Sequence, residues 1–178
     1  LPDFVREGAA AEAKERNLEG WVVTLQYPSM SPFMMYSSNR ELKEKLWKAY
    51  NTRAFGGEFD NSKIVEEIAD TRLQVARLLG YDTYADYVLE ERMAESAPTV
   101  NAFLTELLDR AIGAAHADVK SVAEYAAANG FTGELMPWDF SYYSEKLKNE
   151  KYSINEELTK PYFKLENVQA GIAVSLLI

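Results

Sequence analysis

Hydrophobic residues recur with helical spacing over most of the chain. From Val100 to Ala126 the apolar side chains stand three or four positions apart, which places them on one face of an α-helix. Ser96 is a suitable cap for this helix, Pro98 is tolerated in a first turn, and Asn129-Gly130 supplies a left-handed stop. The pattern predicts a helix of about eight turns.

Three further helices are predicted upstream by the same pattern and by their end signals. The first has Asn39 as its cap and ends at Gly56-Gly57, and the second begins at Asn61 or Ser62 and ends at Gly80. A short third helix follows, because Thr83 and Asp86 have capping-box spacing. The side chains expected to face inward are Leu42, Leu46, Ala49 and Tyr50 in the first helix, and Ile64, Val65, Ile68, Leu73, Ala76 and Leu79 in the second. Glu41/Lys45 and Glu44/Lys48 are expected as outward pairs.

The first 36 residues mix helical and strand-like patterns. Residues 2–16 predict a helix, whereas the β-branched and aromatic run Trp21–Leu25 is typical of a strand. The two prolines of Tyr27–Pro32 predict a loop or a sheet edge, and Met34–Tyr36 is a candidate for a second short strand. The expectation is one β-hairpin at most.

The segment after Met136-Pro137 again predicts a helix. Within it Phe140, Tyr143 and Leu147 share one face, Tyr142 and Lys146 share another, and Asp139 suits the positive end of the helix dipole. No repeat with a period of 20–50 residues and no low-complexity linker is visible. The prediction is therefore a mainly α, bundle-like fold of about seven helices, with residues 1–178 as a single unit.

Composition narrows the range of partners. The 178 residues carry 19 Lys and Arg against 28 Asp and Glu, a net charge of -9 that repels phosphate backbones and anionic lipid. Nucleic acid and membrane are therefore not expected as partners. Cysteine is absent, which excludes disulfides and thiolate chemistry and fits a reducing compartment. The longest apolar run, Ile172–Ile178, is far shorter than the roughly 20 residues of a membrane span, and the absence of a signal-peptide pattern favours a cytoplasmic location.

Residues that could perform catalysis are few. His116 is the single histidine, has no ligand partner one turn away, and is expected to be a packing or boundary residue rather than a ligand or base. The adjacent pairs Glu66/Glu67, Glu90/Glu91 and Glu156/Glu157 are typical of a solvated face rather than an acid–base dyad. No phosphate loop and no nucleophile elbow occurs. The sequence thus predicts no catalytic residue and no metal ligand.

An aromatic cluster follows Pro137 and allows two interpretations. Packing in the core is favoured for Phe140 and Tyr143, while the hydroxyl groups of Tyr142 and Tyr143 could equally contribute to a peptide-binding groove. The cluster comprises Trp138, Phe140, Tyr142, Tyr143 and Tyr152.

An ordered set of short motifs resembles the thimet-oligopeptidase and peptidyl-dipeptidase family of zinc metallopeptidases, particularly its bacterial peptidyl-dipeptidase (dipeptidyl carboxypeptidase) branch. The resemblance covers most of the chain. Its motifs are Leu18-Glu19-Gly20-Trp21-Val22, Thr24-Leu25, Tyr27-Pro28, Asn39-Arg40-Glu41-Leu42, Gly57-Glu58-Phe59-Asp60-Asn61, Leu78-Leu79-Gly80-Tyr81, Glu91-Arg92-Met93-Ala94-Glu95-Ser96, Pro137-Trp138-Asp139, Tyr142-Tyr143-Ser144-Glu145-Lys146-Leu147, Pro161-Tyr162-Phe163 and Leu165-Glu166.

The resemblance implies an almost wholly helical peptidase whose two halves enclose a deep channel that admits short peptides. In that family two histidines of His-Glu-Phe-Gly-His and a later glutamate hold zinc, and the motif's own glutamate is the general base. None of these positions exists in this chain, which corresponds to the segment before the zinc helix. Tyr142, Tyr143 and Lys146 match a recurrent family motif and are the candidates for residues near the substrate cleft.

The expected function is that of a helical, non-catalytic portion of such a peptidase, inert alone, whose parent releases dipeptides from the C-termini of short peptides. Zinc belongs to the parent, and no cofactor is predicted for this chain. Both ends look severed, and residues 173–178 depart from the family pattern. The expected partners are short peptides through the parent enzyme, and the rest of the parent chain or a second copy through the apolar C-terminus. The alternative is a stand-alone helical module that binds a peptide or a protein, and a weaker possibility is a metal held by carboxylates and His116.

Overall fold

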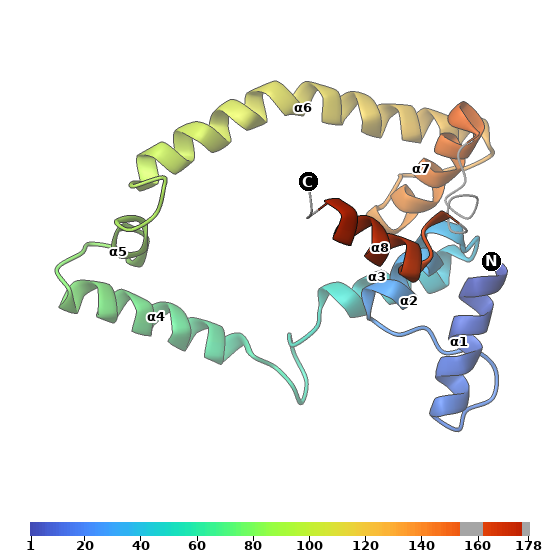
Figure 1. Ribbon diagram of the computed structural model, residues 1–178, viewed down its shortest axis with the longest axis horizontal. Helices are drawn as coiled ribbons and strands as arrows, with labels where there is room; N and C mark the ends of the chain where they lie inside the picture. The colour runs from blue at the N-terminus through green and yellow to red at the C-terminus, as the bar shows by residue number, and fades with distance from the viewer. Residues whose placement is uncertain (154–161, 176–178) are drawn as a thin grey trace.

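The computed structural model describes residues 1–153 and 162–175, and its regular structure in these residues is entirely helical. The mainly α fold predicted from the sequence is therefore confirmed. The helices are α1 (Asp3–Glu15), α2 (Tyr27–Tyr36), α3 (Arg40–Asn51), α4 (Ser62–Leu78), α5 (Tyr84–Leu89), α6 (Ala97–Ala128), α7 (Pro137–Tyr152) and α8 (Leu165–Ser175) (Figure 1).

The helices form a packed cluster and a long arm. The cluster consists of α1, α2, α3 and α7, with α7 in contact with both α2 and α3. The arm consists of α4, α5 and α6, which contact one another in chain order, and it leaves the cluster after α3 and returns to it where the end of α6 packs on α7 (Figure 1). The predicted single unit of 178 residues stays a prediction.

Local end signals place the helices where the sequence predicts them. The side chains of Asn39, Thr83 and Ser96 accept hydrogen bonds from the backbone N–H groups of the third residue of α3, α5 and α6, at donor–acceptor distances of 3.0, 3.1 and 3.3 Å. The long helix α6 spans 32 residues and stops at Asn129-Gly130, where Gly130 has a φ of 85°.

The predicted strand and loop near the N-terminus are wrong. Residues 21–24 form no strand with any described residue, and the predicted loop Tyr27–Pro32 and strand Met34–Tyr36 together form α2. Pro28 lies in the first turn, where the missing N–H costs nothing, and Pro32 removes a single intrahelical bond from a ten-residue helix. Burial of Phe33 and Met34 in the cluster compensates for that loss.

The buried core is small and lies mainly in the cluster. Its apolar members are Val5, Ala9, Ala13, Phe33, Met34, Ala76, Val122, Ala126 and Trp138. In α3 the sequence pattern predicts the wrong inward residue, because Leu42 is 48% exposed whereas Lys43 is only 2% exposed. The reason is the carboxylate of Asp139, which offers Lys43 a charged partner inside the cluster.

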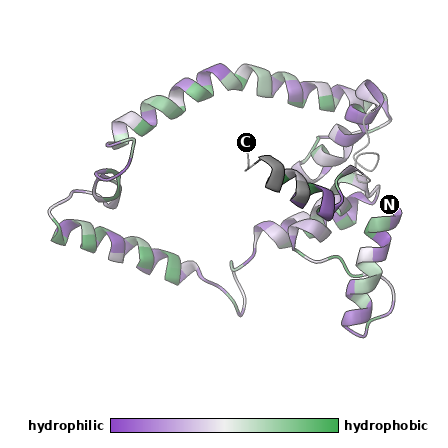
Figure 2. Ribbon diagram, in the orientation of Figure 1, coloured by the Kyte–Doolittle hydropathy of each residue, from purple (hydrophilic) through white to green (hydrophobic). Residues whose placement is uncertain are grey.

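The arm exposes most of the apolar face that its sequence pattern identifies. Of the inward residues predicted for α4 only Ala76 is buried, while Ile64, Val65, Ile68 and Leu79 are exposed. In α6 the exposed apolar side chains include Phe103, Leu104, Leu107, Leu108, Ile112 and Val119. Figure 2 shows these hydrophobic residues along both helices of the arm. The periodicity of the two helices is confirmed, but no described element covers their apolar faces over most of their length.

Two findings concern the remainder of the chain. None of the described helices is both long and apolar enough to cross a membrane. The Glu156/Glu157 pair, Pro161 and residues 176–178 lie outside the described residues, as do the side chains of residues 173–175, so the predictions made for the apolar C-terminus stay predictions. The helix α8 was not among the predicted elements, and its described side chains are exposed.

Candidate functional site

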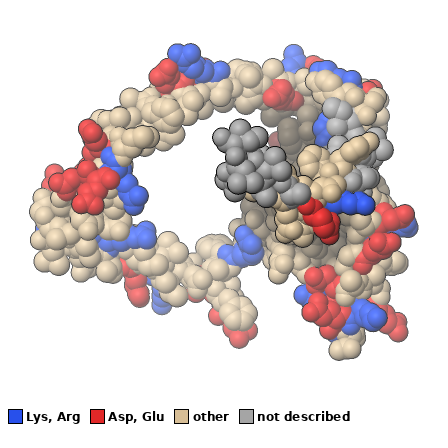
Figure 3. Space-filling view, viewed as in Figure 1, with Lys and Arg blue, Asp and Glu red and all other residues tan. Residues whose placement is uncertain are grey.

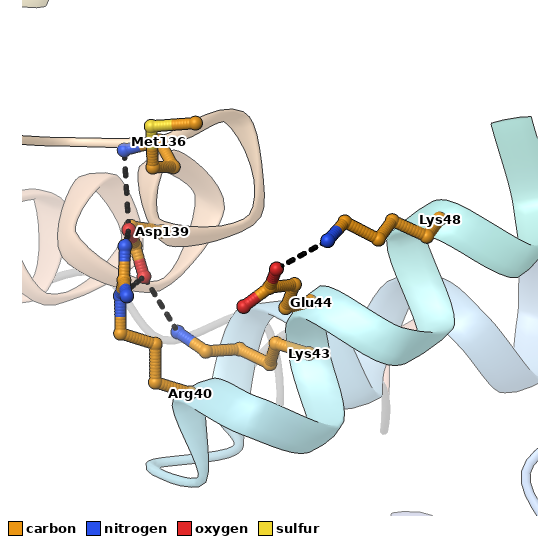
Figure 4. Close-up of polar contacts among 6 residues, drawn as sticks. All are labelled: Arg40, Lys43, Glu44, Lys48, Met136 and Asp139. Carbon is orange, nitrogen blue, oxygen red and sulfur yellow. Dashed lines mark hydrogen bonds and ion pairs between the residues drawn. The ribbon is translucent and has the colours of Figure 1, made fainter.

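A buried polar cluster joins the start of α3 to the start of α7, and we call it the α3–α7 junction. It consists of Arg40 and Lys43 on α3 with Asp139 and Tyr142 on α7. Asp139 is 1% exposed and accepts hydrogen bonds from Arg40 Nε at 3.0 and 3.1 Å and from a terminal guanidinium nitrogen of Arg40 at 2.9 Å. It also accepts a bond of 3.1 Å from the backbone N–H of Met136 (Figure 4).

These contacts follow from the two helix starts. Asp139 occupies the third position of α7, where its carboxylate reaches back to the N–H of Met136 and faces the positive end of the helix dipole. Arg40 is the first residue of α3, so its long side chain can extend beyond the helix end toward α7. The bidentate contact fixes the relative orientation of the two helices more tightly than a single charge pair can.

Lys43 is the most unusual member of the junction because its ammonium group is buried. Its Nζ lies 4.0 Å from Asp139 Oδ1 and 4.3 Å from the centroid of the Tyr142 ring. Burial lowers the pKa of Lys43, and the Asp139 carboxylate opposes that shift, while Arg40 and Lys146 add to it. The aromatic face of Tyr142 partly replaces the water that the ammonium loses.

Arg40 carries the exposed side of the junction. The guanidinium lies 5.6 Å from the Phe131 ring centroid and 5.7 Å from the Trp138 ring centroid. Its hydrogen bonds with Asp139 raise the pKa of Arg40, so this cation keeps its charge at every pH at which the protein is studied. One carboxylate thus serves two cations, and the junction carries an excess of positive charge on a protein whose net charge is -9.

The three predicted cleft residues lie together beside this junction. Lys146 Nζ lies 4.6 Å from the Tyr142 ring centroid, on α7 one turn after it. The rings of Tyr142 and Tyr143 meet edge to face at 5.1 Å, and Tyr143 also contacts Phe131 at 5.3 Å. Burial raises the pKa of Tyr143, and a hydrogen bond with Tyr142 raises that of Lys146. Both tyrosines are half-buried, and contact of any of the three residues with substrate stays a prediction.

The pairing of Arg40 and Lys43 with Asp139 was not predicted from the sequence, although Arg40 and Asp139 each belong to a motif of the family resemblance. Asn39-Arg40-Glu41-Leu42 and Pro137-Trp138-Asp139 both belong to the family resemblance, and the structure brings these two motifs together. Asp139 was assigned only a role at the helix dipole. No local pattern links positions 40 and 139, because their contact depends on the course of the whole arm.

Trp138 gives the junction an apolar wall. It is 7% exposed, its ring meets that of Trp47 at 5.6 Å, and Lys48 Nζ lies 5.6 Å from its ring centroid. Within the described residues its indole N–H is buried without a hydrogen-bond partner. Buried donors are normally satisfied, so this N–H is an energetic cost that the packing of the two tryptophans offsets.

The donor set of the described residues does not fit a zinc site. His116, predicted to be a packing or boundary residue, lies exposed on α6 and is not buried among the described residues. No three side chains of His, Cys, Asp or Glu gather in the described part of the chain. A zinc site of the hydrolytic type takes three such ligands. The junction offers one buried carboxylate, and two cations already engage it.

The described chain is therefore a helical protein in which a packed cluster, closed by a buried ion-pair junction, carries a long arm with exposed apolar faces. The sequence model for peptidase family M3 matches residues 33–176, so the chain belongs to this family. The M3 family is a family of zinc metallopeptidases. The family predicted from the ordered motifs is thus confirmed.

Several relatives from this family match nearly the whole chain. Oligopeptidase A of Escherichia coli strain K12 is 40% identical over 168 residues, which is 92% of this chain and 25% of that protein. Dipeptidyl carboxypeptidase of the same strain is 29% identical over 164 residues, or 90% of this chain and 24% of that protein. Saccharolysin of Saccharomyces cerevisiae is 29% identical over 165 residues, which is 89% of this chain and 23% of that protein. The chain spans about a quarter of the length of the curated relatives that it matches.

Proposed function

We propose that this chain is a helical, non-catalytic portion of a zinc-dependent oligopeptidase or peptidyl-dipeptidase that hydrolyses short peptides, and that it is inert alone. Membership in family M3 and the similarity to proteins named oligopeptidase A and dipeptidyl carboxypeptidase support the peptidase class. The sequence identity is higher with oligopeptidase A than with dipeptidyl carboxypeptidase. Hydrolysis of short peptides, including the release of C-terminal dipeptides, is proposed for the parent enzyme alone.

The observation that carries this proposal is the exposed apolar surface of the arm. Val65 is 63% exposed, Phe103 60% and Ile64 52%, and these residues lie on faces whose helical periodicity is that of buried helices. Contiguous apolar faces of this kind mark surfaces that other protein covers. We assign that covering role to further polypeptide of the parent enzyme, with self-association as the other partner proposed.

The chemistry is assigned to residues that this chain does not contain. In the family that the chain resembles, the zinc ligands and the general base belong to a His-Glu-Phe-Gly-His helix and to a later glutamate. Zinc, when bound there, would activate water for attack on a peptide carbonyl. The proposed contribution of this chain is structural. The α3–α7 junction holds the two ends of the arm in place, and Tyr142, Tyr143 and Lys146 are proposed to lie at the wall of the peptide channel. The proposed location is cytoplasmic.

The direct test is incubation of this chain with zinc and a mixture of short peptides, followed by mass spectrometry of the products. The expected result is no cleavage, with oligopeptidase A as the positive control under the same conditions. Zinc-dependent release of dipeptides, abolished by a chelator and retained after further purification, would contradict the proposal. Plasma emission analysis of the dialysed chain provides a second readout, because a stoichiometric bound metal also contradicts it.

The alternative is a stand-alone helical module that binds a peptide or protein. It is favoured by a groove of about 300 Å³ in the cluster, which is lined mainly by apolar side chains. Titration calorimetry with short peptides tests this alternative, since measurable affinity in the absence of zinc supports a binding module. Absence of any affinity leaves the structural role as the better account.

A further inference from the structure

The segment of residues 21–25 has one backbone edge bonded to the cluster and one edge free. The N–H of Val22 donates to the carbonyl of Ala9 at 3.0 Å, and the N–H of Thr24 donates to Ser29 Oγ at 2.9 Å. The N–H groups of Val23 and Leu25, between and after them, have no hydrogen-bond partner in the described part of the chain. Alternate N–H groups of this segment are therefore bonded to the cluster or unbonded, although the segment itself is not part of a strand.

The side chains of the same two residues line the groove introduced above. Val23 and Leu25 line it together with Leu42 and Leu46 of α3 and Phe33 of α2. The residues that carry the two free N–H groups thus also contribute to the lining of the groove. The groove therefore combines an apolar channel with a row of unused backbone donors.

Lys45 is the one charged residue among the described residues that line this groove. The sequence predicted a pair with Glu41 one turn earlier, but the described residues show no ion pair for Lys45, whereas Lys48 does pair with Glu44 at 2.5 Å. The ammonium of Lys45 is exposed and available to a ligand. A carboxylate is the complementary group for such a cation beside an apolar channel.

We propose that this groove binds an extended peptide segment that adds as a strand to the free edge of residues 21–25, with an apolar side chain in the groove and an acidic side chain two positions away against Lys45. The two-residue spacing follows from the strand period, since both side chains must point to the same face. Strand addition uses the main-chain bonds for affinity and the groove for specificity. Exposed strand edges are the usual templates for such pairing.

The test is a titration of the ¹⁵N-labelled chain with the peptide acetyl-Thr-Val-Thr-Glu-Thr-amide, followed by NMR to about 1 mM peptide. The expected result is saturable shifts centred on the amides of Val23 and Leu25. Blocked termini exclude a free terminal carboxylate as the recognised group. In the control peptide acetyl-Thr-Thr-Val-Glu-Thr-amide, Val and Glu are adjacent and point to opposite faces, so it should bind at least about tenfold more weakly. The first peptide with N-methylated amides should be weakened by a similar factor, because it lacks the main-chain donors that strand pairing needs.

The charge requirement is tested on the protein side. Lys45→Glu should weaken binding of the acidic peptide at least about tenfold and create a preference for the peptide in which Lys replaces Glu. Lys63→Glu on α4 is the matched control, makes the same charge change on an element outside the cluster, and should leave binding unchanged. Circular dichroism checks that both variants keep their helicity.

Three outcomes overturn the proposal: no shifts at Val23 and Leu25, equal binding of the adjacent-residue or N-methylated peptide, and unchanged binding by Lys45→Glu. If a variant loses its structure, the comparisons between peptides still test the proposal, because they use the unaltered chain. The inference does not rest on the proposed peptidase role. Peptide cleavage by the isolated chain contradicts that role alone, while failure of strand addition leaves it in place.

Discussion

Asp139 is the residue on which the cluster depends most. It is buried, it neutralises a buried ammonium on another helix, and it holds the guanidinium of Arg40 with two nitrogens. A buried pair contributes modestly when intact, because desolvation offsets the attraction between the charges. Removing one partner is costly, since the remaining charge is left buried.

Asp139→Asn is therefore expected to lower the free energy of unfolding by about 3 kcal/mol. The loss arises because Lys43 and Arg40 keep their charges without a counter-ion. Urea unfolding followed by circular dichroism measures it, with Asp118→Asn on the exposed surface of α6 as the control, expected to change stability by less than about 0.5 kcal/mol. Equal effects of the two substitutions would show that the junction contributes nothing specific.

Lys43 gives the stability of the protein a pH dependence of defined sign. Its folded pKa lies below the ordinary 10.5, mainly through burial, so between these two values the unfolded chain binds more protons than the folded one. Stability should consequently rise as the pH increases toward 10.5, and Lys43→Met should remove that rise. Urea unfolding from about pH 7.5 to 9.5 tests this.

The upper limit of that window avoids the groups of the opposite sign, among them Tyr143 and Lys146. The pKa of Tyr143 is raised above 10.0 and that of Lys146 above 10.5, so the stability that each contributes is lost only as the pH rises past those ordinary values. Identical slopes for the wild type and Lys43→Met below about pH 9.5 would refute the assignment to Lys43.

At the scale of elements, the two parts of α6 differ in burial. Its C-terminal part buries Val122 and Ala126 against the cluster, whereas residues 101–121 are exposed on every side. A helix longer than 30 residues that is anchored to the cluster only near one end should be least protected along its exposed middle part. This asymmetry can be tested with one substitution made at two positions.

Ala126→Leu is expected to destabilise the protein by about 1–3 kcal/mol, because Ala126 is 0% exposed and the larger side chain must displace its neighbours. Ala111→Leu, on the exposed part of the same helix, should change stability by less than about 0.5 kcal/mol. Both changes preserve helix propensity closely, so unfolding measurements compare packing alone. A similar cost at both positions would show that residue 111 is packed in solution.

The elements also show what the sequence can and cannot predict. The caps Asn39, Thr83 and Ser96 were predictable because each acts within its own first turn. The strand predicted at Trp21–Leu25 failed because a strand needs a neighbour, and residues 34–36 went into α2 instead. Burial of Lys43 was unpredictable because it depends on a carboxylate 96 positions away. Helical periodicity locates an apolar face, but it does not say which element covers it.

On the scale of the whole molecule, the protein encloses an opening. In the space-filling view of Figure 3 the arm and the cluster surround an open space, and the surface of the arm shows stretches of uncharged side chains between groups of charged ones, which are most numerous at its far end. Uncovered apolar faces of this size promote association in water. The isolated chain should accordingly associate at high concentration through the arm.

The double substitution Leu104→Glu with Leu108→Glu is expected to reduce that association, measured as weight-average mass by light scattering at equal concentration. Both leucines are more than half exposed, so unfolding free energy should change little. Arg110→Glu is the control, because it also lowers the net charge by two but removes no apolar surface. If Arg110→Glu reduces the mass equally, general charge repulsion rather than the apolar face governs association.

The bond between Arg40 and Asp139 joins residues 99 positions apart, and the intervening chain contains the whole arm. The arm's own contacts join neighbouring helices, so α4, α5 and α6 can form before the junction closes. Closing so long a loop is the slow step expected in folding, yet its entropic cost grows only with the logarithm of loop length, by about 0.6 kcal/mol for each doubling. The arm can therefore gain or lose helical turns over evolution at little cost, provided that both of its ends still return to the same pair of charges.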